Sequence, residues 1–276
     1  MAAYSSEQTQ TALPQGLLID LDGTLFHGSV MIDGADRLIR LLKELELPYL
    51  FVTNNSSASP ETVAERMQAM GIPAEPEDVC TSAQGAAAYI AGEKPGAKVA
   101  VIGEEGLLEA VRGAGLNVVY QNPDYVLQGI DRGLTYDKVA EAVRLIRGGA
   151  GSIMTNPDLL LPSEGGVIPG AGSIGAMIQA ASGVQPVVIG KPSPILMNVA
   201  LERLGIGAER ALVIGDNLAT DIAAGNNAGC RSLLVMTGIT NKDNYEALRL
   251  QAGAEPDQIC EDLNELISYI SAMFRK

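Results

Sequence analysis

The chain has 276 residues, 47% of them hydrophobic, and carries 33 acidic against 19 basic residues, a formal net charge of −14. So strong a negative charge repels a phosphate backbone, which argues against nucleic acid as the main partner. No stretch approaches the length of a membrane span, and the polar start lacks the basic and apolar parts of a signal peptide, so we expect a cytoplasmic protein without membrane contact.

Cysteine and histidine usage restricts the chemistry further. Cys80, Cys230 and Cys260 are far apart and form no paired motif, so we expect buried thiols rather than a zinc site or disulfides. His27 is the single histidine, which rules out a multi-histidine metal site. We interpret His27 as an incidental loop residue in preference to a proton carrier, and its role stays open.

The chain opens with a loose polar tail at residues 1–15, which we expect to be flexible. An unbroken apolar run at 17–19 follows and is typical of a strand buried on both faces of a parallel sheet. Asp20 ends this run, and Gly23 begins the turn that leaves it. A helix at 38–45, a strand at 49–52, a polar loop at 53–57 and a helix beginning at Ser59–Pro60 come next.

A stretch rich in proline and acidic residues at 73–78 indicates a boundary, after which a second α/β unit of roughly a hundred residues begins. Its helices are predicted at 82–91, 104–114, 136–147 and 173–181, and its strands at 98–102, 117–120, 125–129 and 152–155. The remaining strands are predicted at 187–189, 211–214 and 232–236. The remaining helices are predicted at 194–204, 242–250 and 262–274, and one more helix after the strand at 211–214 ends at about residue 228. Strands that alternate with helices predict parallel sheets.

Two carboxylates at the end of the first strand, Asp20 and Asp22, point to a cation. Ligands bind beyond the carboxyl ends of strands in open α/β sheets. Two such close negative charges need a proton or a shared cation, and no lysine or arginine lies between Leu13 and Arg37. A hard divalent cation with oxygen ligands, Mg²⁺ foremost, resolves this conflict better than a pair of solvated turn residues does.

Four loops share one property, because each begins where a predicted strand ends and the ends of parallel strands face the same edge of a sheet. Together they contain carboxylates, a hydroxyl with neighbouring amides, and a lysine, which suits a site for a metal and an anion. They are Asp20 to Thr24, Thr53 to Ser57, Gly190 to Ser193, and Gly215 to Asp221.

Each loop has a role that phosphate chemistry would require. Asp20 suits a nucleophile that forms an acyl phosphate, and Asp22 suits a group that protonates the leaving alkoxide and later deprotonates water. Lys191 can cancel negative charge as it builds up between phosphate and nucleophile. The remaining roles are a metal ligand at Asp216 supported from behind by Asp221, and phosphate binding by Thr53 and the amides of Asn54 and Asn55.

These four segments, in this order, resemble the signature motifs of the haloacid dehalogenase superfamily. The segments are Asp20-Leu21-Asp22-Gly23-Thr24, Thr53-Asn54-Asn55, Gly190-Lys191-Pro192 and Gly215-Asp216…Asp221. The closest resemblance is to the NagD or 4-nitrophenylphosphatase-like branch, on account of the Thr-Asn-Asn loop, the Gly-Lys-Pro-Ser segment and an α/β unit inserted between the second and third motifs.

The resemblance implies a Rossmann-like, doubly wound parallel sheet as the core, with a mobile inserted α/β cap domain. It places the core at 16–79 and 186–276 and the cap at 80–185. It implies Mg²⁺ held by Asp20, the backbone carbonyl of Asp22, and Asp216. It also implies small phosphorylated metabolites as substrates, and it is compatible with a homodimer formed through the cap.

Some features have competing interpretations. Residues 170–175 fit the dinucleotide fingerprint G-x-G-x-x-G, but Pro169 rather than a strand precedes them, so we interpret them as a joint between loop and helix. Asn156, Asp158 and Glu164 are candidates for substrate contacts from the cap, although a polar loop beside a helix is the interpretation that we favour.

The sequence therefore predicts a Mg²⁺-dependent phosphatase that hydrolyses small phosphate monoesters, such as sugar phosphates or nucleoside monophosphates, through an aspartyl phosphate. Two alternatives stay open: a phosphomutase, which would use the same nucleophile and acid, and a regulator that binds a phosphorylated metabolite without turnover.

Overall fold

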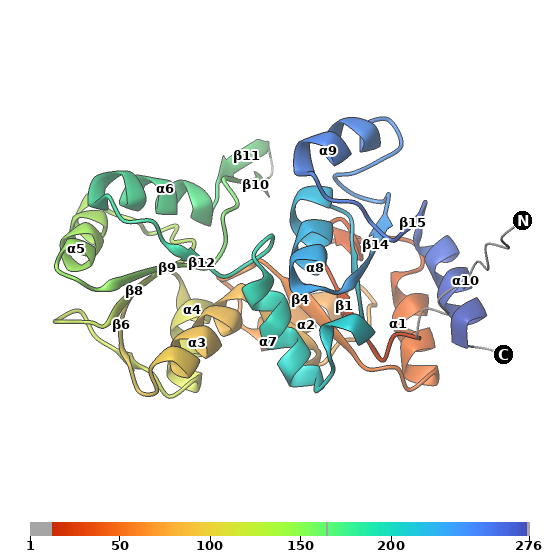
Figure 1. Ribbon diagram of the computed structural model, residues 1–276, viewed down its shortest axis with the longest axis horizontal. Coiled ribbons are helices and arrows are strands. Elements are labelled where there is room, and N and C mark those ends of the chain that lie inside the picture. The colour runs from red at the N-terminus through yellow and green to blue at the C-terminus, as the bar shows by residue number, and fades with distance from the viewer. Residues whose placement is uncertain (1–12, 164, 275–276) are drawn as a thin grey trace, which may run out of the picture.

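The computed structural model describes residues 13–163 and 165–274. Two parallel sheets, each with helices on both faces, lie at opposite ends of the molecule (Figure 1). The predicted α/β class, with a doubly wound parallel sheet, is confirmed. Within the described ranges, no helix has both the length and the apolar character needed to cross a bilayer.

The first sheet has six strands in the order β15-β14-β13-β1-β4-β5, and every neighbouring pair is parallel. Its strands are β1 (Gly16–Ile19), β4 (Tyr49–Thr53), β5 (Val79–Thr81), β13 (Ala211–Gly215), β14 (Arg231–Val235) and β15 (Gln258–Cys260). Alternate residues of β1 enter different cores, as the two-residue period of a strand requires. Leu17 and Ile19 pack in the core beneath the first set of helices, and Leu18 packs in the core on the opposite face.

Helices cover both faces of this sheet. The helices on the Leu17 face are α1 (Ala35–Glu44), α2 (Pro60–Ala69) and α10 (Leu263–Phe274). The helices on the Leu18 face are α7 (Pro194–Leu204) and α8 (Ala223–Ala228), and α9 (Tyr245–Ala252) packs beside β14 and β15. Because β1 lies in the middle of the sheet and is fully buried, its carboxyl end is held in a fixed position.

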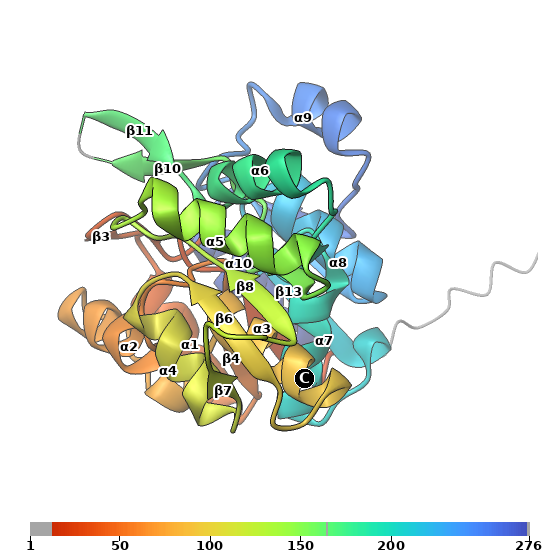
Figure 2. The same ribbon diagram turned by 90° about the vertical axis from the view of Figure 1, so that its left-hand side faces the viewer.

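The second sheet has five parallel strands in the order β12-β9-β8-β6-β7. Its strands are β6 (Lys98–Ile102), β7 (Asn117–Val118), β8 (Tyr125–Gln128), β9 (Gly151–Met154) and β12 (Val187–Val188). The helices on one face are α3 (Ser82–Glu93) and α4 (Glu105–Gly113). The helices on the other face are α5 (Tyr136–Arg147) and α6 (Ala171–Ser182), which lie above the sheet in Figure 2.

Two short antiparallel hairpins complete the fold, and the sequence analysis predicted neither. They are β2 (Phe26–His27) with β3 (Val30–Met31), and β10 (Leu160–Ser163) with β11 (Gly166–Pro169). The second hairpin extends from the second sheet toward the first (Figure 1). Strands this short carry too few alternating residues for a pattern to stand out from loop sequence.

The structure differs from the expected division of the chain in two places. Residues 187–189 were expected in the first unit, but β12 pairs with β9 and so belongs to the second sheet. The expected boundary at 79/80 falls inside β5, which pairs with β4. Three consecutive apolar residues predict a buried strand equally well in either sheet, so the pattern could not decide which sheet takes them.

The end of the expected flexible tail belongs to the fold. Pro14 is buried, and the backbone N–H of Gln15 donates to the carbonyl of Arg210 at 2.7 Å. The rest of the expected tail, residues 1–12, lies outside the described residues. This backbone hydrogen bond joins the segment just before β1 to the segment just before β13.

Candidate active site

A cavity of about 820 Å³ lies where the carboxyl ends of the two sheets face each other. All eight side chains that the sequence predicts for the site line this cavity: Asp20, Asp22, Thr53, Asn54, Asn55, Lys191, Asp216 and Asp221. The opposite wall follows strands of the second sheet and contains Ile130, Arg132, Asn156, Asp158 and the apolar start of hairpin β10–β11. The two sheets therefore build one site together.

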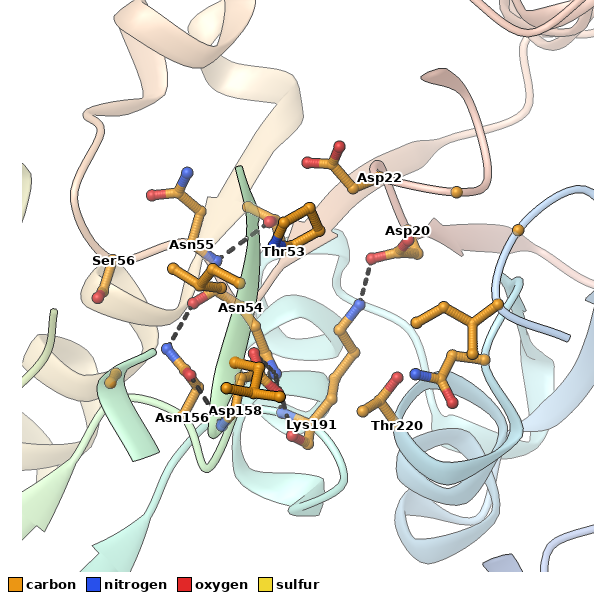
Figure 3. Close-up of a pocket in the computed structure, with 18 of the residues that line it drawn as sticks. Asp20, Asp22, Thr53, Asn54, Asn55, Ser56, Asn156, Asp158, Lys191 and Thr220 are labelled. Carbon is orange, nitrogen blue, oxygen red and sulfur yellow. Dashed lines mark hydrogen bonds and ion pairs between the residues drawn. The ribbon is translucent and has the colours of Figure 1, made fainter. Parts of the chain in front are cut away.

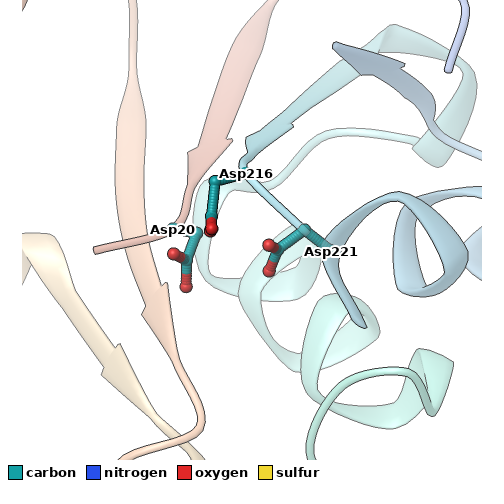
Figure 4. A group of neighbouring side chains, drawn as sticks. All are labelled: Asp20, Asp216 and Asp221. Atoms are coloured by element: carbon teal, nitrogen blue, oxygen red, sulfur yellow. The ribbon is translucent and has the colours of Figure 1, made fainter. Parts of the chain in front are cut away.

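Three carboxylates form the most acidic part of the cavity (Figure 4). Asp20 follows β1, Asp216 follows β13, and Asp221 lies in the helical turn that leads to α8. One oxygen from each lies within 4.8 Å of one from the others. Burial and the negative charge of Asp221 raise the pKa of Asp216 to about 7, and the same causes raise the pKa of Asp20 well above its usual value.

The backbone of two loops packs so closely against Asp216 that side chains at Gly23 and Gly238 would not fit. The N–H of Ile239 donates to Oδ2 of Asp216 at 2.6 Å. A Cβ atom at Gly238 would lie 2.0 Å from that same oxygen, and one at Gly23 would lie 2.4 Å from it. Gly23 also has a φ of +88°, a conformation that side chains disfavour. Only glycine at these two positions lets two loops close around the carboxylate.

Lys191 places a single cation among the three carboxylates. Its Nζ donates to Asp20 (Figure 3), to Oδ1 of Asp221 at 2.6 Å and to the carbonyl of Val52 at 3.0 Å. Burial alone would lower the pKa of Lys191, but Asp20 and Asp221 outweigh it and raise that pKa. One lysine against three carboxylates leaves an excess of negative charge, so the cluster suits a metal ion with a preference for oxygen ligands.

Lys191 belongs to a different sheet from the one that the sequence analysis expected. The sequence analysis assigned its loop to the same sheet as Asp20, yet the loop follows β12 of the second sheet. Lys191 nevertheless reaches the carboxyl end of β1, because the two sheets present their carboxyl edges to the same cavity. The prediction that Lys191 lies beside Asp20 holds, although the reason given for it does not.

Asp22 differs from the other carboxylates because its side chain is 65% exposed. It lies on the turn after β1, and its Oδ1 is 3.9 Å from Nη2 of Arg66. That guanidinium group lies over the ring of Phe26 and donates to the carbonyl of Gly28 at 2.6 Å. An exposed acid at the mouth of the cavity can exchange protons with water, unlike the buried Asp221.

The loop after β4 uses most of its polar groups internally. Oγ1 of Thr53 accepts from the N–H of Asn55 at 3.1 Å, which leaves the hydroxyl hydrogen of Thr53 for another acceptor. Oδ1 of Asn55 accepts from the N–H groups of Ser57 and Ala58. The side chain of Asn54 binds Lys191 and Asp158 (Figure 3). Phosphate binding by this loop therefore stays a prediction for the Thr53 hydroxyl and the backbone.

Asn156 and Asp158 are part of the cavity wall, contrary to the polar-loop interpretation that we favoured. Asn156 is buried, and its Nδ2 donates to the carbonyl of Asn54 at 2.8 Å. Burial raises the pKa of Asp158, against the effect of its hydrogen bonds from Asn54. Both residues follow β9. The expectation that ligands bind beyond the carboxyl ends of strands, which pointed to Asp20, would therefore have pointed to them as well. Glu164 lies outside the described residues, and His27 lines the cavity from β2.

The glycine motif at 170–175 has a packing role. The N–H of Gly172 donates to the carbonyl of Asp158 at 2.9 Å. A Cβ at Gly172 would lie 2.1 Å from the carbonyl oxygen of Pro157, and one at Gly170 would lie 2.2 Å from that of Asp158. The glycines thus let the start of α6 contact the Asn156–Asp158 loop directly. This agrees with the expected joint between loop and helix.

Two family models match the chain. The model described as haloacid dehalogenase-like hydrolase matches residues 17–117, and a related hydrolase model of the same family matches residues 188–266. The matched segments contain every residue of the four motifs. The match therefore rests on the same loops that form the cavity.

Characterised relatives cover nearly the whole chain. The 5'-nucleotidase YutF of Bacillus subtilis is 44% identical over 256 residues, which span 93% of this chain and 98% of the relative. An acid sugar phosphatase of Staphylococcus saprophyticus is 42% identical over 251 residues, 91% of this chain and 95% of the relative.

A solved structure agrees with these relatives. The p-nitrophenyl phosphatase from Archaeoglobus fulgidus superimposes with a TM-score of 0.89 at 35% identity, covering 94% of this chain and all of that one. The branch that the motifs resemble is thus also the branch of a solved neighbour. The chain belongs to the haloacid dehalogenase-like hydrolase family.

Proposed function

We propose that this protein hydrolyses small phosphate monoesters with the help of Mg²⁺, through an aspartyl phosphate on Asp20. The observation that carries the proposal is the contact of Lys191 with both Asp20 and Asp221 beside Asp216, inside a cavity enclosed by two sheets. The names of the relatives, a nucleotidase and sugar phosphatases, agree with a phosphorylated metabolite as substrate.

The residues around Asp20 fit a magnesium ion. We assign Asp20, Asp216 and the backbone carbonyl of Asp22 as its ligands, with Asp221 behind them. The glycines that enclose Asp216, and the excess of carboxylates over lysine, support this assignment. When bound, the ion supplies positive charge that offsets the repulsion between an anionic substrate and an anionic nucleophile.

The reaction has two steps. A carboxylate oxygen of Asp20 attacks phosphorus and forms an acyl phosphate, while the bond to the leaving oxygen breaks and Asp22 gives that oxygen its proton. Asp22 then takes a proton from water, whose oxygen attacks phosphorus, breaks the acyl bond and restores Asp20 as inorganic phosphate leaves. Lys191 and the Thr53 hydroxyl stabilise the charge on the phosphoryl oxygens.

The test is phosphate release by the purified protein from 4-nitrophenyl phosphate, a sugar phosphate and a nucleoside monophosphate, with Mg²⁺ or with EDTA. Release that depends on Mg²⁺ is the expected result. An isomerised sugar phosphate without free phosphate would instead identify a phosphomutase. Tight binding without any product would identify a regulator and contradict the proposal.

The proton donor is tested by Asp22→Asn. Loss of a general acid should cost about 10²- to 10⁴-fold in kcat/KM, which reports the step in which the leaving group departs, for a sugar phosphate whose alkoxide needs a proton. The loss should be smaller for 4-nitrophenyl phosphate, because nitrophenolate leaves without one. Equal losses for the two substrates would contradict the assigned role of Asp22.

We further propose that the second sheet with its helices acts as the cap of this site. Dimerisation through this unit stays a prediction, which light scattering on the intact chain can test.

A further inference from the structure

The side chain of Asn54 forms hydrogen bonds with both the N–H and the carbonyl group of Lys191. Its Oδ1 accepts from the N–H of Lys191 at 2.8 Å, and its Nδ2 donates to the carbonyl of Lys191 at 3.1 Å. The same Nδ2 donates to the carboxylate of Asp158, at 3.1 Å to Oδ2 and 3.3 Å to Oδ1. Every strong donor and acceptor of this amide is therefore in use within the protein (Figure 3).

This arrangement works in only one orientation of the amide. If the group turned over, its nitrogen would face the N–H of Lys191 and its oxygen would face the carbonyl, so both contacts would become repulsive. Asp158, when ionised, only accepts hydrogen bonds, and it contacts the nitrogen end. It therefore favours the orientation that holds Lys191.

Asp158 is itself held in place. Asn156 donates from Nδ2 to the carbonyl of Asn54 at 2.8 Å and accepts at Oδ1 from the N–H of Asp158 at 3.2 Å. Gly172 donates to the carbonyl of Asp158 at 2.9 Å. Over residues 13–163 and 165–274, no lysine or arginine forms an ion pair with Asp158, so the Asn54 amide is its side-chain partner.

We propose that Asp158 is a positioning residue that fixes the Asn54 amide and thereby holds the Lys191 backbone, so that Nζ meets Asp20. The inference rests on the proposed function, because it adds a residue to that site. It assigns a task to a residue of the second sheet for which, within the described part of the chain, no hydrogen bond to Asp20 is found.

The expected effect is a loss in turnover. Outer-shell hydrogen-bonding partners of metal ligands are typically worth about 10- to 100-fold in activity, and we expect the same range for Asp158, which acts on Lys191 through Asn54. Asp158→Ala should lower kcat by that factor and change KM little, because Lys191 acts on the developing charge. The factor should be the same for 4-nitrophenyl phosphate, a sugar phosphate and a nucleoside monophosphate, since Asp158 acts through the lysine and not on the leaving group.

Two comparisons separate positioning from a structural role. Asp158→Asn keeps an acceptor oxygen for Asn54 and should retain most of the wild-type kcat. Asp131→Ala removes another buried carboxylate of the second sheet, one that binds Lys138 at 2.7 Å and lies outside the cavity. It should lower the melting temperature at least as much as Asp158→Ala does and leave kcat unchanged.

A double variant tests the route through Asn54. If Asp158 acts only through Asn54, Asp158→Ala should cost no further activity once Asn54→Ala is present. Fully additive losses would overturn the inference. So would an unchanged kcat in Asp158→Ala, a loss that varies strongly with the leaving group, or equal kcat losses in Asp158→Ala and Asp131→Ala.

The outcomes also separate this inference from the proposed function. A wild-type protein that releases no phosphate from any ester overturns the proposed function, and the inference with it. An active wild type whose Asp158→Ala variant is equally active overturns the inference alone.

Discussion

The carboxyl edges of the two sheets face the same cavity but contribute different groups to it. The edge of the six-stranded sheet supplies Asp20, Asp216 and Thr53, and the first two have raised pKa values because they are buried together. The edge of the five-stranded sheet supplies Lys191, which reaches Asp20, and side chains such as Asn156 and Asp158 that bind the loop after β4. In the proposed reaction the first edge supplies the reacting carboxylate, while the second edge encloses the cavity and positions Lys191.

The largest expected effect tests the first edge. Asp20→Asn replaces the attacking carboxylate by an amide, so kcat for 4-nitrophenyl phosphate should fall by about 10⁴-fold or more. Phosphate release under saturating substrate and Mg²⁺ measures the effect. The matched control is Asp33→Asn, which alters an exposed carboxylate paired with Arg37 at 3.0 Å and should leave kcat unchanged. Substantial turnover by Asp20→Asn would place the nucleophile elsewhere.

The second-largest effect is expected at Lys191, the charged side chain that the second edge places beside Asp20. Lys191→Met removes the cation between Asp20 and Asp221, so kcat should fall by about 10³-fold. The two carboxylates would lose their buried partner, so the free energy of unfolding in EDTA should fall by about 3–5 kcal/mol. Urea denaturation measures that change.

The control for this variant is Lys138→Met, which removes a half-exposed lysine from the pair with Asp131. It should cost less stability and no activity. If Lys191→Met kept its activity, the second edge would only enclose the site and would contribute no charge to the reaction.

A smaller effect concerns the metal and again belongs to the first edge. At a Mg²⁺ concentration of about 100 times its dissociation constant, binding should stabilise the fold by about 2.7 kcal/mol. The melting temperature should therefore rise by several degrees over that in EDTA. Asp216→Asn should remove most of this shift. A shift of the same size in the variant, or with a monovalent salt at equal ionic strength, would exclude Asp216 as a ligand.

The smallest effect concerns packing behind the second edge. Gly172→Ala would put a Cβ 2.1 Å from the carbonyl oxygen of Pro157, so the loop with Asp158 must shift. Such overpacking should cost about 1–3 kcal/mol in the free energy of unfolding.

Gly92→Ala in α3 is the matched control, because a Cβ there meets nothing within 4 Å. It should raise stability by up to about 1 kcal/mol through helix propensity. Equal destabilisation by both substitutions would show that the contact with Pro157 is unimportant.

The α/β class and the first edge of the cavity could both be predicted from short stretches of sequence. Apolar runs that end in Asp20, Thr53 and Asp216 mark buried parallel strands, and the geometry of such sheets brings their carboxyl ends together. The pattern is local, so a few neighbouring residues are enough to predict it. The motif resemblance then led to the family that the comparisons confirm.

Three features depend instead on long-range packing: the sheet that β12 joins, the path by which Lys191 reaches Asp20, and the partners of Asn54. Asn54 lies 137 residues before Lys191 and 104 before Asp158 in the chain. Contacts over such separations depend on how the two sheets face each other, and the residues that flank each position do not encode that arrangement. Local patterns fix where strands end, whereas the packing of whole units fixes which of those ends meet.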